Sequence, residues 1–359
     1  MKKFVKLFCI PLGLLFAVST VTAQDDFQSQ LEKLVGQNAE SYVQPLVTST
    51  GIGLNSGVYN TAKVHSLLGF DVTINANVVT IPDEGKTYTF DTSALDELTF
   101  TFTNPGGGSD IDIVLDAAQV YPSMEDAPTV FGETGAQNLT PDETYVENTI
   151  VTRLAEETPL TEAQVRSQMG NEINTQISQI PQVPIPPGFD LPGMATASLQ
   201  ASLGLPFGTE AQLRYIPASP INEDLGDFGL LGLGARISID QFIPVPFFPV
   251  DISAGAFYQN VELGPVNITS NIIHAEVSKS IPMITVYGGF GLESSKLTAE
   301  YDYTAPNGTV APVEVELEGE NGFRTTLGAR LKLLLLTINA DYSIGEYNSA
   351  NVGVGLTFR

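Results

Sequence analysis

The sequence has few of the side chains that usually carry catalysis or cross-linking: one cysteine, no tryptophan and two histidines in 359 residues. The cysteine, Cys9, lies in an N-terminal stretch that we expect to be removed, so the mature chain would form no disulfide and no thiolate site. His65 and His274 are 209 positions apart, and no G-x-S-x-G or H-E-x-x-H motif is present. We therefore expect a protein that is not an enzyme and that needs no cofactor or metal.

Basic residues are also scarce, with 16 Lys and Arg against 41 Asp and Glu and a formal net charge of −25. Loss of the N-terminal stretch would remove three lysines and no acidic residue, which takes the net charge to −28. Nucleic-acid phosphates would repel such a chain, so we expect no nucleic-acid partner.

Apolar runs long enough to cross a bilayer as a helix are missing beyond residue 23, since the most apolar stretches, 242–250 and 331–338, are too short. Residues 1–23 have the pattern of a secretory signal peptide. They combine Lys2, Lys3 and Lys6 with the apolar stretch 7–21 and a small-residue cleavage site at Ala23. We expect export, to the periplasm, to the medium or into the outer membrane as a closed barrel.

The second half of the chain consists of short segments in which apolar residues alternate with small or polar ones. In 194–205, Leu199 and Leu203 fall on one face of a strand, and Gln200 and Ser202 fall on the other. Similar runs lie at 207–217, 228–241, 249–263, 266–279, 283–293, 295–304, 322–334, 335–345 and 350–359.

Two folds fit this alternation. In an outer-membrane barrel the apolar face meets lipid and the polar face lines the lumen, whereas in a soluble sandwich the polar face meets water. Run lengths near ten residues, and Phe358 near the end of the final strand, favour the barrel. The sequence therefore predicts an all-β protein, an antiparallel transmembrane β-barrel of about 12–14 strands.

Two amphipathic helices are predicted, at 26–43, ending before Pro45, and at 160–180, where Thr161 and Gln164 have capping-box spacing. Each would plug the barrel or lie at its periplasmic mouth. Strands are predicted at 51–63 and 68–81, and residues 83–163 carry 17 acidic residues against two basic ones. The expected segments are a signal peptide (1–23), a helix or plug (24–50), first barrel strands (51–82), an acidic loop-rich insert (83–159), a helix with Pro-rich linker (160–193) and the C-terminal strands (194–359).

Cations on the polar register are the candidate ligand-binding residues of the lumen. They could attract an anionic solute, or they could pair with inward Asp and Glu from neighbouring strands and fill the barrel. The candidates are Arg236, Arg324, Arg330, Lys332 and His274.

One run resembles a known family. Asn38-Ala39-Glu40-x-Tyr42-x-x-Pro45-Leu46 is followed by Gly53-Leu54-Asn55-Ser56-Gly57-x-Tyr59 and by Leu67-Leu68-Gly69-Phe70-Asp71-Val72-Thr73-Ile74. This run resembles an uncharacterised family of exported proteins from Bacteroidota, a domain of unknown function, which supplies no functional residues to transfer. A helical segment ahead of a Gly-rich barrel is also similar in architecture to the long-chain fatty-acid channels of outer membranes.

The expected function is passive movement or binding of a small amphipathic or anionic solute by a monomeric outer-membrane barrel. Its expected partners are outer-membrane lipid and the barrel-assembly machinery, which would read the C-terminal strand. The alternatives are a surface barrel that is structural or adhesive and does not transport, and a secreted β-sandwich that binds a ligand.

Overall fold

The computed structural model describes residues 37–358 apart from 223–225, 245–248, 265 and 305–309. The predicted signal peptide and the first part of the predicted helix 26–43 lie outside the described residues. The chain forms two compact units. One is a barrel built from Gln44–Pro82 and Leu191–Arg359, and the other contains Asp83–Asp190 together with residues 37–43.

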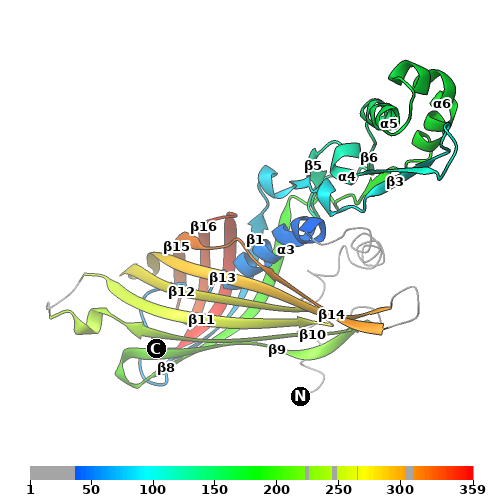
Figure 1. Ribbon diagram of the computed structural model, residues 1–359. Helices are drawn as coiled ribbons and strands as arrows, with labels where there is room; N and C mark the ends of the chain where they lie inside the picture. The colour runs from blue at the N-terminus through cyan, green and yellow to red at the C-terminus, as the bar shows by residue number, and fades with distance from the viewer. Residues whose placement is uncertain (1–36, 223–225, 245–248, 265, 305–309, 359) are drawn as a thin grey trace. The chain divides into compact units, whose positions relative to one another are not determined.

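The barrel is closed and antiparallel, and ten strands form its ring (Figure 1). Each strand pairs with the next, and β17 pairs with β1 to close the circle. In ring order the strands are β1 (Phe70–Thr80), β8 (Gly193–Leu205), β9 (Thr209–Asn222), β10 (Gly226–Ser238), β11 (Asp251–Leu263), β12 (Val266–Ile281), β13 (Ile284–Thr304), β15 (Phe323–Leu333), β16 (Leu336–Ile344) and β17 (Ser349–Phe358). A further strand, β14 (Val310–Glu318), pairs antiparallel with the second half of β13 and is not counted in the ring.

The barrel class predicted from the sequence is confirmed, but the predicted number of 12–14 strands is too high. The runs 283–293 and 295–304 form one strand of 21 residues, β13, because nothing in its pairing with β12 interrupts it. The strand-like pieces between 83 and 163 belong to the second unit.

The burial pattern of the strands decides between barrel and sandwich. Along β1, Val72 and Ile74 are exposed, whereas Thr73 and Asn75 are only 2% and 1% exposed. The same inversion, apolar outside and polar inside, runs through β16, β17 and the part of β12 from Ile273 to Ser278. Such an exterior suits hydrocarbon rather than water, as in outer-membrane barrels.

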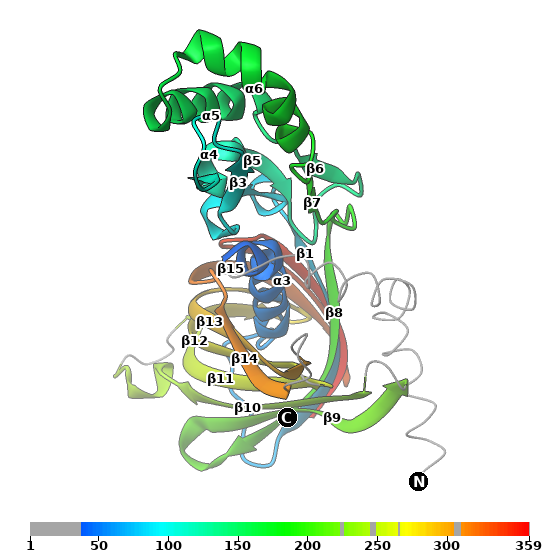
Figure 2. The same cartoon turned by 45° about the vertical axis from the view of Figure 1, so that its right-hand side comes forward.

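A helix occupies the barrel interior (Figure 2). Helix α3 (Gln37–Asn55) does not end before Pro45 as predicted but continues through it, and residues 51–55 are helical rather than extended. A proline in a helix removes a backbone hydrogen bond. The helix continues because barrel side chains hydrogen-bond to its later carbonyls, a tertiary effect that local sequence rules do not include.

The second unit has its own core and is not the loop-rich insert that its acidic composition predicts. Three two-stranded pairs are present: β2 (Thr87–Phe90) with β5 (Met124–Pro128), β3 (Leu98–Phe102) with β4 (Ile111–Leu115), and β6 (Gln137–Leu139) with β7 (Val183–Ile185). They accompany helices α4 (Ala117–Val120), α5 (Glu143–Glu157) and α6 (Glu162–Ile177). Two short 3-10 turns, Asp83–Gly85 and Thr92–Ala94, also belong to this unit. Two more, Pro206–Gly208 and Asp240–Phe242, belong to the barrel.

Helix α6 confirms the helix predicted at 160–180. The capping box of Thr161 and Gln164 is formed, and Val165, Met169 and Ile173 are buried as their spacing predicts. The helix packs against α5 within the second unit, so of the two predicted helices only α3 provides a plug. No helix among the described residues is both long and apolar enough to cross a bilayer.

Candidate functional site

Residues 44–69, here called the lumen segment, run through the barrel from one end to the other. At one end Gln44 donates to the carbonyl of Glu318, and Thr48 accepts from the backbone N–H of Glu320. At the opposite end the backbone N–H of Leu68 donates to the carbonyl of Gly204, just before β1 begins. The segment therefore occupies the full length of the lumen.

Arg214 of β9 holds the C-terminal turn of α3. Its side chain is fully buried and donates to the carbonyls of Leu54 and Ser56, at 2.5 and 2.9 Å. Gln200 and Gln259 accept from the same guanidinium at 2.9 and 3.0 Å. The last carbonyls of a helix have no partner within it and carry partial negative charge, so a buried cation stabilises them.

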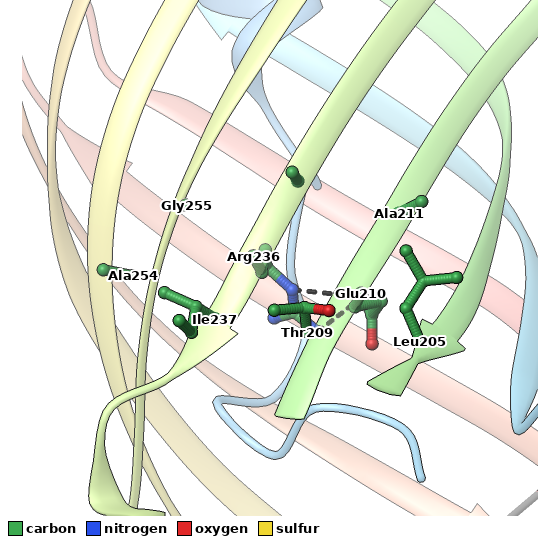
Figure 3. Close-up of a pocket in the computed structure, with 9 residues that line it drawn as sticks. Leu205, Thr209, Glu210, Ala211, Arg236, Ile237, Ala254 and Gly255 are labelled. Carbon is green, nitrogen blue, oxygen red and sulfur yellow. Dashed lines mark hydrogen bonds and ion pairs between the residues drawn. The ribbon is translucent and has the colours of Figure 1, made fainter. Parts of the chain in front are cut away.

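Arg236 of β10 is the centre of a second cluster. Its guanidinium lies 2.8 Å from Glu210 of β9 (Figure 3). It also lies 3.0 Å from Glu276 of β12 and donates to the carbonyl of Thr61 at 2.7 Å. All three charged side chains are buried. A buried charge is tolerated only when it is paired and hydrogen-bonded, and this cluster meets that condition.

Both histidines join this cluster to the lumen segment. His65, in the segment, lies 2.7 Å from Glu210 through Nδ1 and 3.2 Å from the Thr357 hydroxyl through Nε2. His274, on β12, lies 2.6 Å from the Glu276 carboxylate through Nδ1. Its ring stacks on that of Tyr59 of the segment, with the ring centroids 5.1 Å apart. The result is a buried chain of alternating charge-bearing groups, His65–Glu210–Arg236–Glu276–His274.

A third fastening lies nearer the start of the segment. Arg324 of β15 pairs with Glu293 of β13 at 3.1 Å and donates to the hydroxyl of Ser56 at 2.9 Å. Asn55 donates to Glu293 at 3.1 Å and to the carbonyl of Asn271 at 3.1 Å. We name the inner faces of β9 to β13 and β15, which carry the charged side chains of these three clusters apart from His65, the charged wall.

The inner faces of β16, β17 and β1 differ, and we name them the asparagine wall. They present Asn75, Asn77, Asn339 and Asn351 together with threonines, serines, glycines and two aspartates. The Asp341 carboxylate accepts from Tyr287 at 2.8 Å and from Asn351 at 2.7 Å. Several of the other polar atoms on this wall have no protein partner.

Little free space remains inside the barrel. The lumen cavity between the segment and the walls, beside Tyr59, Arg324 and Asp341, measures about 10 Å³, which is close to the space of one water molecule. Another hollow, of about 440 Å³, is lined by outward residues such as Leu205 and Ile237 together with Glu210 and Arg236 (Figure 3). In the described structure the lumen segment therefore blocks the lumen.

The whole sequence matches one family profile, described as a family of unknown function (DUF6588), over residues 1–358. The chain belongs to this family. This agrees with the resemblance noted at residues 38–74. A search of curated proteins found no similar sequence.

A comparison with solved structures found outer-membrane proteins at low similarity. OmpT of Vibrio cholerae is 11% identical with a TM-score of 0.24, over 45% of this chain and 55% of that one. The KdgM porin is 13% identical with a TM-score of 0.23, over 45% of this chain and 92% of that one. The aligned part of this DUF6588 chain thus spans about half the length of OmpT.

The structure separates the predicted lumen residues of this DUF6588 protein into two groups. Arg236, Arg324 and His274 are buried and paired with carboxylates, which is the second of the two alternatives considered for them. Arg330 is 7% exposed with no hydrogen-bond partner in the described residues, and Lys332 is exposed at the end of β15. Only these last two remain available to a solute.

Sequence reasoning missed the residues that fasten the segment: Arg214, Glu210, Glu276 and His65. Arg214 and Glu210 fall on the polar register of the run 207–217, so their inward direction could have been predicted. Their partners could not, because these lie on a segment that was expected to be extended. No group of three or more His, Cys, Asp or Glu among the described residues could hold a metal ion.

Proposed function

We propose that this protein is exported by a cleaved signal peptide to the outer membrane. There it would act as a monomeric gated channel for a small solute, with the lumen segment as its gate. The observation that carries the proposal is that a separate stretch of chain, and not wall side chains alone, fills a lumen to which every strand of the ring contributes buried polar side chains. A separate segment can move while the barrel stays intact.

The contacts of the segment support movement. Apolar packing inside the barrel includes a small cluster, Val58, Tyr59, Phe257, Ile272 and Tyr287, and buried side chains of the helix such as Val47 and Ile52. Many of the other contacts are hydrogen bonds and ion pairs. Water can replace such hydrogen bonds and ion pairs when a gap opens. An open, permanently conducting porin is not what the filled lumen supports.

Charge limits the solute. Arg236 and Arg324, which could have drawn an anion into the lumen, are paired with Glu210, Glu276 and Glu293. An anionic solute would find only Arg330 and Lys332, near one end of β15. The proposal therefore concerns small solutes and includes no catalytic step, cofactor or nucleic acid.

Two partners follow from the barrel itself. Its exposed apolar belt would contact outer-membrane lipid. The final strand β17 presents Val352, Val354, Leu356 and Phe358 on its outer face and pairs with β1, so we propose that the assembly machinery reads this strand before the ring closes.

Swelling of proteoliposomes in arabinose tests the proposal. Refolded wild type should swell faster than protein-free vesicles, and a variant with a loosened segment, Arg214→Ala with Gln259→Ala, should swell at least several-fold faster than wild type. Heat-modifiable gel mobility verifies that each barrel is folded. Folded barrels of both proteins that swell no faster than empty vesicles would remove the channel proposal.

A second candidate is a surface barrel that presents its second unit without transport. The observation that favours it is the independent core of that unit, including Phe102, Leu115, Ile150 and Leu154. Replacing 83–190 by a short Gly-Ser linker should abolish a surface phenotype while gel mobility of the barrel is retained. Swelling that persists in this variant would favour the channel.

A further inference from the structure

The lumen segment is fastened unevenly around the barrel. Every strand of the charged wall gives it at least one hydrogen bond, from Arg214, Arg236, Gln259, Ser278, Ser295 and Arg324 among others. The asparagine wall gives three, at 3.2 to 3.4 Å, from Ser349, Thr357 and Asn75. Strand β16 gives none among the described residues, so the segment is held from one side.

Besides these hydrogen bonds, two glycines of the lumen segment lie against the asparagine wall and its β8 border. A Cβ on Gly57 would lie 2.9 Å from the Asn351 side-chain oxygen, and one on Gly53 would lie 2.9 Å from Thr196 of β8. Gly57 also has a φ of +68°, which favours glycine. The segment therefore presents to this side a surface with little to interlock, and it could separate from the wall without breaking strong contacts.

The asparagine wall also carries polar atoms that the protein does not satisfy. Thr73 and Thr337 are 2% and 0% exposed, and neither hydroxyl has a hydrogen-bond partner. The side-chain oxygens of Asn75, Asn77 and Asn351 are buried and likewise without one. Buried polar groups in native proteins nearly always have a partner, from protein or from water. A wall with this many open positions is suited to hydrogen-bonding molecules that come and go.

We propose that solute passes between the lumen segment and the asparagine wall, while the segment stays fastened to the charged wall. This deepens the gated-channel proposal and rests on it. The residues that would contact the solute are Thr73, Asn75, Asn77, Thr337 and Asn351, which lie on adjacent strands in register.

The chemistry of these groups indicates the class of solute. Amide and hydroxyl side chains both donate and accept hydrogen bonds and carry no charge. The wall's Asp341 is already bonded to Tyr287 and Asn351, and its Asp71 interacts electrostatically with Arg330. A small uncharged solute rich in hydroxyl groups, such as a pentose, would replace the missing partners, whereas an anion would lose its hydration without gaining a counter-charge from this wall.

Two engineered disulfides test the route, and they are matched. Ser56 and Ser349 join the segment to β17 with oxygens 3.2 Å apart, and Thr61 and Ser278 join it to β12 with oxygens also 3.2 Å apart. All four side chains are buried, and the expected mature chain has no other cysteine. The pairs Ser56→Cys with Ser349→Cys, and Thr61→Cys with Ser278→Cys, would be compared by swelling in arabinose, oxidised and reduced.

We expect the oxidised β17 lock to lower swelling at least tenfold, with recovery on reduction, and the oxidised β12 lock to stay within twofold of wild type. If the oxidised β12 lock stops swelling, the segment must also move away from the charged wall for solute to pass. That result would overturn the proposed route but not the proposed channel. If both oxidised locks leave swelling unchanged, the route is also wrong. Folded protein that never swells, even reduced, overturns both proposals.

The rates at which two different solutes enter vesicles that carry the wild-type protein give an independent test. Gluconate, an anion of similar size, should enter at least fivefold more slowly than arabinose. Gluconate that enters faster would assign the path to Arg330 and Lys332 and would overturn the proposed solute class.

Discussion

The charged wall and the asparagine wall enclose the same segment but treat it differently. On the charged wall, buried ions such as Arg236 have several partners, here Glu210, Glu276 and the Thr61 carbonyl. On the asparagine wall, uncharged side chains such as Thr73 and Thr337 stay without protein partners. Because it is bound strongly on one side and faces open hydrogen-bonding positions on the other, the lumen segment can stay in the barrel and still move away from the asparagine wall.

The energetic cost of buried charge explains why fastening is concentrated in so few residues. A buried arginine such as Arg236 is stabilised by several partners at once, so it organises several neighbours. Removing one partner therefore affects a whole cluster, whereas removing an unpaired hydroxyl affects almost nothing. The two walls should respond to substitution very differently.

The largest difference is expected at Arg236. Arg236→Met leaves Glu210 and Glu276 buried without their counter-ion, which should lower the free energy of unfolding by about 3–5 kcal/mol. Urea titration in vesicles, followed by gel mobility, measures this. Adding Glu210→Gln and Glu276→Gln should restore much of the loss. If the single variant is as stable as wild type, the fastening by the charged wall is wrong.

A charge on the outer face of β17 sharpens the comparison. It tests whether these strands tolerate substitution only on their inner face, the asparagine wall, or on both faces. Val354 is outward and 48% exposed. Val354→Arg should lower the free energy of unfolding by about 2–4 kcal/mol if it lies near the bilayer midplane. The same titration checks it, with Val354→Ala as control. An arginine tolerated like alanine would contradict a lipid-facing exterior.

Loss of Arg214 should have the next effect. Arg214→Met removes the donor to the Ser56 carbonyl and leaves Gln200 and Gln259 without their partner, a cost of about 2–3 kcal/mol. Hydrogen exchange of residues 52–58 should accelerate in the same variant. Arg330→Met is the matched control, since that arginine has no hydrogen-bond partner in the described residues, and it should change neither quantity appreciably.

The smallest effect is expected on the asparagine wall. Thr337→Val replaces a buried hydroxyl without a partner by a methyl group of similar size, so unfolding should shift by less than about 1 kcal/mol. Urea titration again measures it. A loss as large as that of Arg214→Met would show that the hydroxyl has a strong partner and that the two walls are not different in kind.

Alternation along the strands predicts the barrel and the inward direction of its polar residues. Val72 and Thr73, for example, face opposite sides as their register requires. The strand count is not predictable in the same way, because the 21 residues of β13 resemble two strands separated near Ser294.

The site is less accessible to sequence reasoning. Pro45 indicates the end of a helix, and only the enclosing barrel explains why α3 continues. The contrast between walls depends on ring closure, which places Asn75 of β1 beside Gly353 of β17, far apart in the chain. No local pattern contains that pairing.

Chemical labelling of single cysteines in the folded protein tests the unequal fastening most directly. Asn77→Cys and Thr337→Cys report on the asparagine wall, and Ser253→Cys and Gln259→Cys report on the charged wall, all at sites at most 2% exposed. With a small water-soluble thiol reagent, the first pair should react at least tenfold faster than the second. Equal rates, or faster reaction on the charged wall, would contradict the account.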